Sequence, residues 1–369
     1  MGNARNLGSF LGNNTSLSTI NDAYDAGTLV PSVTTTNPNM VINGAMEINQ
    51  RGDKTGLTTG GYMLDRHNVQ INNMGTVSVT QDTDVPSGQG FSKSMKIQCT
   101  ATGTLNTGTS SLIFIHRIEG FDSVQTMFGT SDAKDVTLSF WIKANRTQTL
   151  TVNFENEQTS GGNSDQGYQT SQAYTTANTW QKMVITIPGD TRSGMGFNFN
   201  SSKALCFDIS LSTGYTSSTT PSATWSQLSN SQRHGHNTEY FGDSTANYFN
   251  ITGVKLELSS EATDFQHVPH GEELTKCQRY YFKSSTMATS FADATSASYT
   301  FRGKRYAKHS LPTVMRANPS VTAIQHVANY SGGVTASGER DYVYLAPSST
   351  TQLSGTQYWY GGFTADAEI

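Results

Sequence analysis

The chain has 369 residues, of which 35% are apolar and 14% are charged, and its formal net charge is −4. A nearly neutral charge without a run of lysine or arginine argues against nucleic acid as a partner, and no stretch approaches the ~20 apolar residues that span a membrane. Polar side chains and 34 glycines occur together with 10% aromatic residues, which favours extended strands joined by polar turns over disorder.

The three cysteines, Cys99, Cys206 and Cys277, are odd in number and widely spaced. They form no CxxC pair, so neither a zinc site nor a disulfide framework is predicted, and no cofactor is expected. The N-terminal residues lack the basic-then-apolar layout of a secretion signal. We therefore expect synthesis in a reducing cytoplasm and export by a route other than secretion.

Residues 1–39 are polar and contain few core-forming side chains. A short helix is predicted over 18–27, because Ile20 and Tyr24 would share one face and Gly27 would end it. A linker rich in threonine and proline follows it. Such an arm is too small to form a hydrophobic core of its own, so we expect it to pack on a neighbouring subunit or on another protein.

Alternation of apolar and polar residues dominates from about 40 to 268. Runs of this kind occur at 136–143, 150–154, 183–187 and 205–211. A further run changes phase at Gly253, as a β-bulge would cause. Several half-buried strands without intervening helices predict a jelly-roll sandwich of two packed sheets over 40–268.

A connector helix is predicted over 269–283. Glu272 and Glu273 lie in its first turn, where the helix dipole favours acids, and Glu272 can pair with Lys276 one turn later. Leu274, Cys277 and Tyr281 would form its apolar face. Strand patterns return at 299–301, 321–323, 341–345 and 358–360, so a smaller all-β domain is predicted over 284–369.

Several separate stretches resemble one family. Residues 39–52 (NMVINGAMEINQRG), followed by Asp65-Arg66, are similar to the opening of a jelly-roll module found in tail-fibre and virion structural proteins of tailed phages, notably marine ones. Residues 140–144 (FWIKA) are similar to the central strand that this module shares with carbohydrate-binding jelly rolls. Its closing signature is resembled by residues 253–257 (GVKLE), 262–265 (ATDF) and 271–281 (GEELTKCQRYY). Residues 363–369 (FTADAEI) resemble the end of the C-terminal domain that often follows.

The resemblance implies a virion protein, made in the host cytoplasm and often trimeric, with residues 1–39 attaching it to other virion proteins. Gln266 stands where the family more often has glutamate, and His267-Val268 replace a basic pair. Similar modules occur in fibres, baseplates and head decorations, so two functions stay open. One is a tail fibre or receptor-binding appendage that recognises a host surface glycan. The other is a non-adhesive head decoration or connector.

Aromatic residues in polar segments favour the adhesive function, because aromatic rings stack on sugar C–H groups and weak sites gain from multivalency. The candidate ligand-binding residues are Trp225 and Tyr240, in the polar segment 212–248, and Tyr358, Trp359 and Tyr360 near the C-terminal end. Packing is the alternative role for each of them. Trp141 and Trp180 fall within strand patterns and are interpreted as packing residues.

No catalytic or metal site is predicted, so the chain is expected not to be an enzyme. Glu155 and Glu157 would share one strand face, as paired carboxylates in sugar cleavage require, but we interpret them as solvated strand positions. Glu257 is interpreted as structural. His234 and His236 are interpreted as loop surface residues.

A few further residues invite functional interpretations that we do not favour. Cys277, on the apolar helix face, is interpreted as a small buried hydrophobe rather than a nucleophile. His267 and His270 flank the helix start and are assigned a capping or junction role. Arg51-Gly52-Asp53 matches an adhesion tripeptide but lies in a predicted turn.

Overall fold

The computed structural model describes most of the chain beyond the N-terminal arm. The described residues are 38–156, 166–193, 200–214, 221–228, 239–284, 287–291, 307–328, 334–347 and 357–369. The predicted arm up to residue 37, its helix over 18–27, the strand at 299–301, Glu157, His234 and His236 lie outside these residues.

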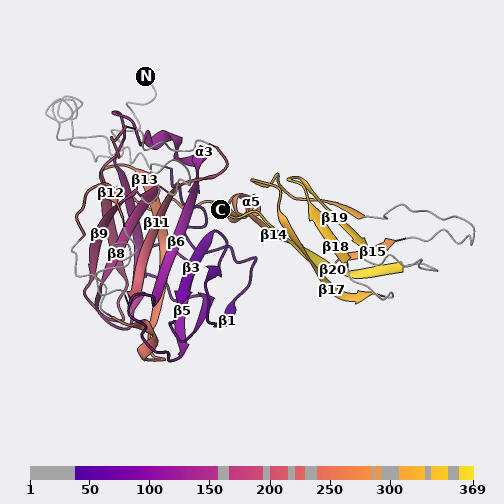
Figure 1. Ribbon diagram of the computed structural model, residues 1–369, viewed down its shortest axis with the longest axis horizontal. Helices are drawn as coiled ribbons and strands as arrows, with labels where there is room; N and C mark the ends of the chain where they lie inside the picture. The colour runs from indigo at the N-terminus through magenta and orange to yellow at the C-terminus, as the bar shows by residue number, and fades with distance from the viewer. Residues whose placement is uncertain are drawn as a thin grey trace, which may run out of the picture. The chain divides into compact units, whose positions relative to one another are not determined.

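Two antiparallel sheets built from residues 54–258 form the sandwich. The first, sheet A, has six strands in the order β1 (Lys54–Leu57), β4 (Thr76–Asp82), β5 (Ser94–Ala101), β13 (Tyr248–Leu258), β7 (Val136–Ala144) and β10 (Gln181–Ile187). Sheet B has seven, in the order β12 (Ser226–Gln227), β9 (Gln166–Tyr174), β8 (Gln148–Asn156), β11 (Lys203–Thr213), β6 (Ser111–Glu119), β3 (His67–Asn72) and β2 (Gly61–Tyr62). Figure 1 looks onto sheet B, with β9, β8, β11, β6 and β3 following one another from left to right.

The apolar side chains of the alternating runs fill the space between the two sheets. Leu138, Phe140 and Ile142 on β7 are fully buried there, as are Phe207 and Ile209 on β11. Burial of one such side chain contributes about 1.5–3 kcal/mol. The all-β jelly-roll sandwich predicted from the alternation is therefore confirmed.

The phase change at Gly253 is a β-bulge. The register between β13 and β7 shifts between Thr252 and Lys255, and Gly253 has a φ of 63°. A Cβ atom at this position would lie 2.6 Å from the Cζ atom of Phe91. Glycine is required here both by the left-handed backbone and by the close approach of the Phe91 ring.

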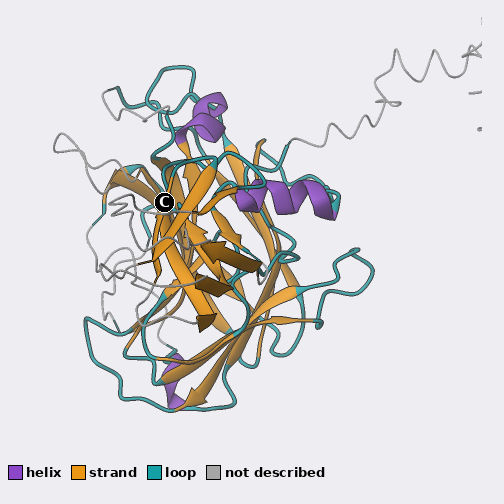
Figure 2. Cartoon of the chain, turned by 90° about the vertical axis from the view of Figure 1, so that its right-hand side faces the viewer, coloured by secondary structure: helices purple, strands orange, loops and turns teal. Residues whose placement is uncertain are grey.

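The connector helix, α5, spans His270–Gln278 and is shorter than predicted. Lys276 Nζ lies 3.0 Å from a Glu272 carboxylate oxygen, which confirms that pair, and Cys277 is buried. Tyr281 does not continue the helix, because β14 (Tyr281–Lys283) pairs with the last strand of the chain. The described residues also include short helices that were not predicted, namely α3 (Gly120–Ser123), η1 (Val124–Thr126) and η2 (Phe241–Asp243). Figure 2 shows how little helix accompanies the strands.

Two smaller sheets follow α5. Sheet C contains β14, β20 (Gln357–Asp366), β15 (Met287–Phe291) and β17 (Ser320–Ala328), and sheet D has the order β16 (Ala307–Ser310), β19 (Tyr342–Pro347), β18 (Val334–Gly338). A separate core includes Met315, Val343, Leu345 and Phe363. The smaller β unit that the sequence predicts after the helix is thus present.

Candidate functional site

The outer face of sheet A carries a cluster of aromatic and charged side chains, which we call the Trp180 face. It consists of Asp84, Lys96, Lys143, Asn178, Trp180 and Tyr248. Lys143 and Tyr248 project from β7 and β13 on the side opposite the core, because strand side chains alternate. Trp180 directly precedes β10, whose first residue, Gln181, pairs with Ile142 of β7.

Asp84 organises one side of this face. Its carboxylate accepts a hydrogen bond from the Nζ atom of Lys143 at 2.7 Å and another from the Nε1 atom of Trp180 at 3.0 Å. The hydrogen bond to Asp84 raises the pKa of Lys143. These contacts fix the orientation of the half-buried Trp180 ring, while the Asp84 side chain stays 42% exposed.

On the other side of the Trp180 face, Tyr248 contacts Asn178 and lies near Lys96. Its hydroxyl donates to Asn178 Oδ1 at 2.9 Å, and Asn178 lies in the turn that leads into Trp180. The Lys96 Nζ atom lies 5.6 Å from the centre of the Tyr248 ring. Burial raises the pKa of Tyr248, so its hydroxyl remains a neutral hydrogen-bond donor at physiological pH.

Together these residues supply two half-exposed aromatic rings beside ammonium, carboxylate and amide groups. An aromatic face offers a flat apolar surface, and neighbouring polar groups can bond to hydroxyls around it. This combination matches the two kinds of surface on a pyranose ring. The Trp180 face is therefore suited to bind a saccharide at the protein surface.

Trp225, a predicted ligand-binding residue, is half-buried against the sandwich core. Its ring packs edge-on against Phe128 at 5.4 Å between centroids and lies 5.9 Å from Tyr168. Its Nε1 atom donates to the Pro188 carbonyl at 2.8 Å. These contacts give Trp225 a packing role, and its proposed ligand contact stays a prediction.

Tyr240 also packs against the core, and its hydroxyl donates to the Asn73 carbonyl at 2.6 Å. Tyr358, Trp359 and Tyr360 lie on β20, opposite the β15 residues 288–290. Tyr360 is 45% exposed. The structure brings the last three residues together on one strand, and the ligand-binding role of all four stays a prediction.

The residues of the Trp180 face were not predicted as a site. Alternation in the run 136–143 already places Lys143 on the polar side of its strand. Asp84 and Asn178, however, come from segments outside the strands, and Trp180 comes from the position before β10. They are brought together by the pairing of β4 with β5, of β5 with β13, of β13 with β7 and of β7 with β10.

The prediction that Glu155 is a solvated strand position is wrong. Glu155 projects from the outer side of sheet B and is only 8% exposed. Cys206 lies opposite it on β11, and together with Ile113 and Ile115 it forms a small buried apolar cluster on this side. Alternation identifies the face of a strand but does not say whether that face meets water.

Glu257 has the structural role predicted for it. It is fully buried and lies 3.0 Å from the Lys255 ammonium group, and it accepts hydrogen bonds from the backbone and the hydroxyl of Thr263.

Among the described residues, no group of three or more His, Cys, Asp or Glu side chains could hold a metal ion. No helix within the described ranges is long and apolar enough to cross a membrane.

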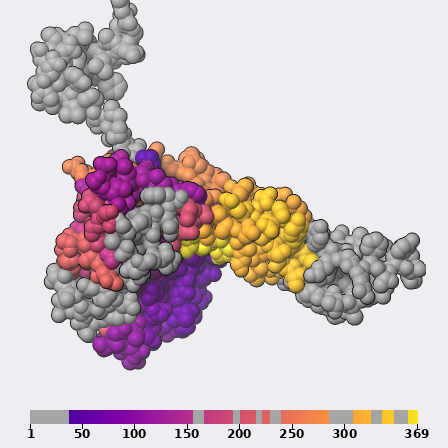
Figure 3. Space-filling model, turned by 45° about the horizontal axis from the view of Figure 1, so that its top comes forward, coloured from indigo at the N-terminus to yellow at the C-terminus, as the bar shows by residue number. Residues whose placement is uncertain are grey.

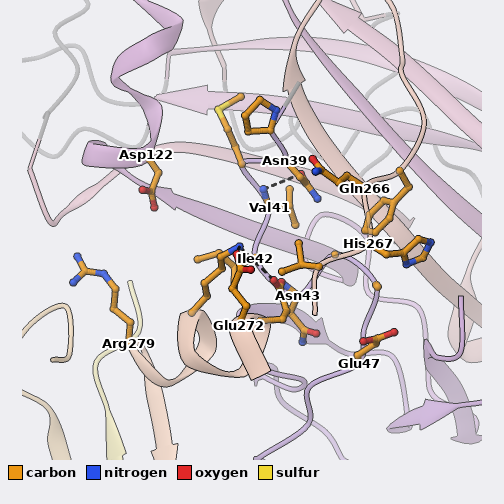
Figure 4. Close-up of a pocket in the computed structure, with 18 of the residues that line it drawn as sticks. Asn39, Val41, Ile42, Asn43, Glu47, Asp122, Gln266, His267, Glu272 and Arg279 are labelled. Carbon is orange, nitrogen blue, oxygen red and sulfur yellow. Dashed lines mark hydrogen bonds and ion pairs between the residues drawn. The ribbon is translucent and has the colours of Figure 1, made fainter. Parts of the chain in front are cut away.

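A pocket of about 820 Å³ lies beside α5. Its lining comes from the loop over 38–47, from the start of the α3–η1 segment, from 265–269 and from α5. Figure 4 shows Asp122 and Arg279 on one side of the pocket and His267 and Glu47 on the other. Gln266 and His267, two of the departures from the family pattern, line this pocket. In the described part of the chain no side-chain hydrogen bond caps the start of α5, which contradicts the capping alternative for His267 and His270, and their junction role stays a prediction.

No family model matches the sequence, and no curated protein matches it significantly. The structure is similar to the enzymatically active domain of tailspike protein 4 of bacteriophage CBA120, with 15% identity and a TM-score of 0.32, over 60% of this chain and 21% of that one. It is also similar to the family 11 carbohydrate-binding module from Clostridium thermocellum in complex with a β-1,3-1,4-mixed-linked tetrasaccharide, with 11% identity and a TM-score of 0.28, over 57% and 98% of the chains.

A third similar structure is the CBM22-2 xylan-binding domain from Paenibacillus barcinonensis Xyn10C. Identity is 12%, the TM-score is 0.28, and the match covers 59% of this chain and 97% of that domain. At these TM-scores, the jelly-roll assignment depends on the strand order and pairing described above rather than on the similarities.

Proposed function

We propose that this chain is a structural protein of a tailed-phage particle, a tail fibre or receptor-binding appendage, that binds a host surface glycan without cleaving it. The observation that carries the glycan-binding part is the Trp180 face. There Asp84 holds the indole of Trp180 through a 3.0 Å hydrogen bond, and Tyr248 adds a second ring beside Lys96 and Lys143. The virion part is supported by the opening and closing stretches that resemble phage virion modules.

Weak binding at one such face suits a multivalent particle. A homotrimer attached through residues 1–39 would present three copies, and linked weak sites can raise avidity by 10²–10⁴ without new contacts. Light scattering on the full chain is expected to return the mass of a trimer. A monomeric mass at micromolar concentration would contradict the proposed homotrimer. It would not bear on glycan binding by the Trp180 face, which has a separate test.

A binding screen against purified host surface polysaccharides tests the proposed site. We expect the full chain to bind a polysaccharide, and Trp180→Ala and Tyr248→Ala each to weaken binding by about tenfold, which corresponds to ~1.4 kcal/mol. Tyr360→Ala is the matched comparison, because Tyr360 is an exposed aromatic residue on β20. If only Tyr360→Ala loses binding, the glycan site lies on β20 and not on the Trp180 face. Release of oligosaccharides from the polysaccharide would contradict the proposal that the chain binds without cleaving.

Electron microscopy tests the place of the protein in the particle. Virions labelled with an antibody against residues 284–369 are expected to carry the label at tail tips or fibres. Label confined to the capsid faces would overturn the appendage and favour the head-decoration function instead. Virions that carry a folded Trp180→Ala variant are expected to lose adsorption to the host. This loss would show that the Trp180 face acts in host attachment.

A further inference from the structure

The pocket beside α5 shares no residue with the Trp180 face. One of its walls is the α3–η1 segment, and the opposite walls come from the loop over 38–47 and from 265–269. Its volume of about 820 Å³ is in the range of ligand-binding pockets, ~300–1,000 Å³. A pocket of this size holds several side chains rather than a single ion.

The α3–η1 wall is apolar and exposed. Phe121 is 59% exposed and Val124 is 45% exposed, and both line the pocket. The described residues include only six exposed large hydrophobic side chains, so two of them within four residues form an unusual local concentration. In Figure 3 the purple stretch that contains α3 lies at the surface. Exposed apolar side chains grouped at the edge of a pocket are typical of interaction sites.

The lining also carries more negative than positive charge. Four carboxylates, those of Glu47, Asp122, Glu272 and Glu273, line the pocket together with two cations, Lys276 and Arg279. Both cations are already paired. Lys276 lies 3.0 Å from Glu272 and 3.8 Å from Glu273, and Arg279 lies 2.6 Å from Glu119.

Asp122 is the carboxylate best placed to receive a further cation. It lies between Phe121 and Val124 in sequence, and no ion pair to it is found within the part of the chain that the structure describes. Desolvation by the surrounding protein raises the pKa of Asp122, the nearby carboxylate of Glu119 raises it further, and the positive charges of Arg279 and Arg66 lower it. A further cation bound beside Asp122 would offset the effects of desolvation and of Glu119.

We propose that this pocket binds a peptide segment of a partner protein in which lysine or arginine side chains lie next to large apolar side chains. The basic group pairs with Asp122, and the apolar groups cover Phe121 and Val124. Charge complementarity identifies a basic rather than an acidic partner, and the exposed apolar wall identifies a peptide rather than a free metal ion or amine. The proposal does not depend on glycan binding, because the two surfaces share no residues.

Fluorescence anisotropy with the full chain and a labelled peptide tests the proposal. The probe is an acetylated, amidated peptide, Gly-Leu-Arg-Phe-Leu-Arg-Gly, and its matched control has glutamate in place of both arginines. We expect the basic peptide to bind at least about tenfold more tightly than the acidic one. Raising the salt from about 0.1 M to about 1 M shortens the Debye length from ~10 Å to ~3 Å and should weaken the basic peptide's binding.

Matched variants locate the binding. Asp122→Asn and Phe121→Ser are each expected to weaken binding about fivefold or more, with Val124→Ser as a second apolar variant. Asp132→Asn and Val314→Ser change an exposed carboxylate and an exposed valine away from the pocket and should leave binding unchanged. Because all these side chains are exposed, circular dichroism should show that every variant folds.

Three results would overturn the proposal. The first is equal binding of the acidic and basic peptides. The second is an effect of Asp132→Asn or Val314→Ser as large as that of the pocket variants. The third is full displacement of the labelled peptide by spermidine at a concentration equal to that of the peptide. This result would make the pocket a general cation site in which the apolar wall has no role.

Discussion

Arg66 and Glu368 form a buried ion pair across 302 positions of the chain. Their side chains are 1% and 4% exposed. The Arg66 guanidinium also lies 3.6 Å from the centre of the Tyr280 ring and donates to the Arg117 carbonyl at 2.6 Å. One fully buried arginine thus contacts the sandwich, the residues after α5 and the C-terminal end of the chain.

Removal of the negative partner should destabilise the protein strongly. Glu368→Gln leaves the Arg66 charge buried without its carboxylate, which typically costs about 3–5 kcal/mol. Urea unfolding measures this change in the free energy of unfolding. Glu261→Gln, at an exposed carboxylate, is the matched control and should change stability by less than about 0.5 kcal/mol. Equal stabilities of the two variants would show that the pair contributes nothing.

Residues from separate stretches of the family resemblance contact one another around the Arg66–Glu368 pair. Arg51, from the opening stretch, lies 3.0 Å from Asp366 and 3.7 Å from the centre of the Tyr281 ring. Tyr280, from the closing stretch, donates its hydroxyl to Glu119 at 2.7 Å. These stretches lie far apart in the sequence, and only the fold shows that the opening stretch contacts the closing stretch and the C-terminal end.

The bulge at Gly253 makes a second stability prediction. Gly253→Ala would have to adopt a φ of 63° and place its Cβ atom 2.6 Å from Phe91, so we expect a loss of about 2–4 kcal/mol. Gly56→Ala separates the two causes, because Gly56 has a φ of 69° but no atom within 4 Å of the added Cβ. It should lose only about 1–2 kcal/mol. Similar losses in both variants would mean that the contact with Phe91 is unimportant.

Two buried histidines predict a loss of stability in mild acid. His67 and His116 face each other with their Nδ1 atoms 3.3 Å apart, and His67 Nε2 lies 2.9 Å from the Asn43 carbonyl. Burial lowers the pKa of His67 to about 4 and that of His116 well below its usual value. As the pH falls below about 6.5, the unfolded chain takes up protons that the folded chain does not, so stability falls. For His67 alone the loss between pH 6.5 and 4 is about 3 kcal/mol.

Urea unfolding at pH 7 and pH 5 measures this effect. Burial raises the pKa of Asp65 and of Glu273, which acts in the opposite direction because the folded state then takes up protons first. His116→Gln isolates the histidine contribution and should reduce the loss of stability between the two pH values. His270→Gln, at an exposed histidine, should not change it. An unchanged pH dependence in His116→Gln would contradict the prediction.

Local patterns predicted the strands well, because each alternating run buries one face regardless of its partners. Phe140 and Phe207 are core residues for that reason. Alternation could not predict which runs pair, and the Trp180 face depends on that pairing. It also could not show that Glu155 lies on a buried outer face, or that Tyr281 leaves the helix to pair with Asp366 of β20.

A comparison of two tryptophans separates packing from binding. Trp225→Ala removes a ring that packs against Phe128 and the core, so we expect a loss of about 2–4 kcal/mol in the free energy of unfolding. Trp180→Ala removes a half-buried ring held by Asp84 on the outer face of sheet A and should cost about 1 kcal/mol or less. Glycan binding should change in the opposite order, with Trp180→Ala weakening it more than Trp225→Ala in variants that remain folded. If Trp225→Ala keeps full stability but loses glycan binding, the ligand contacts Trp225, and the Trp180 face is not the main site.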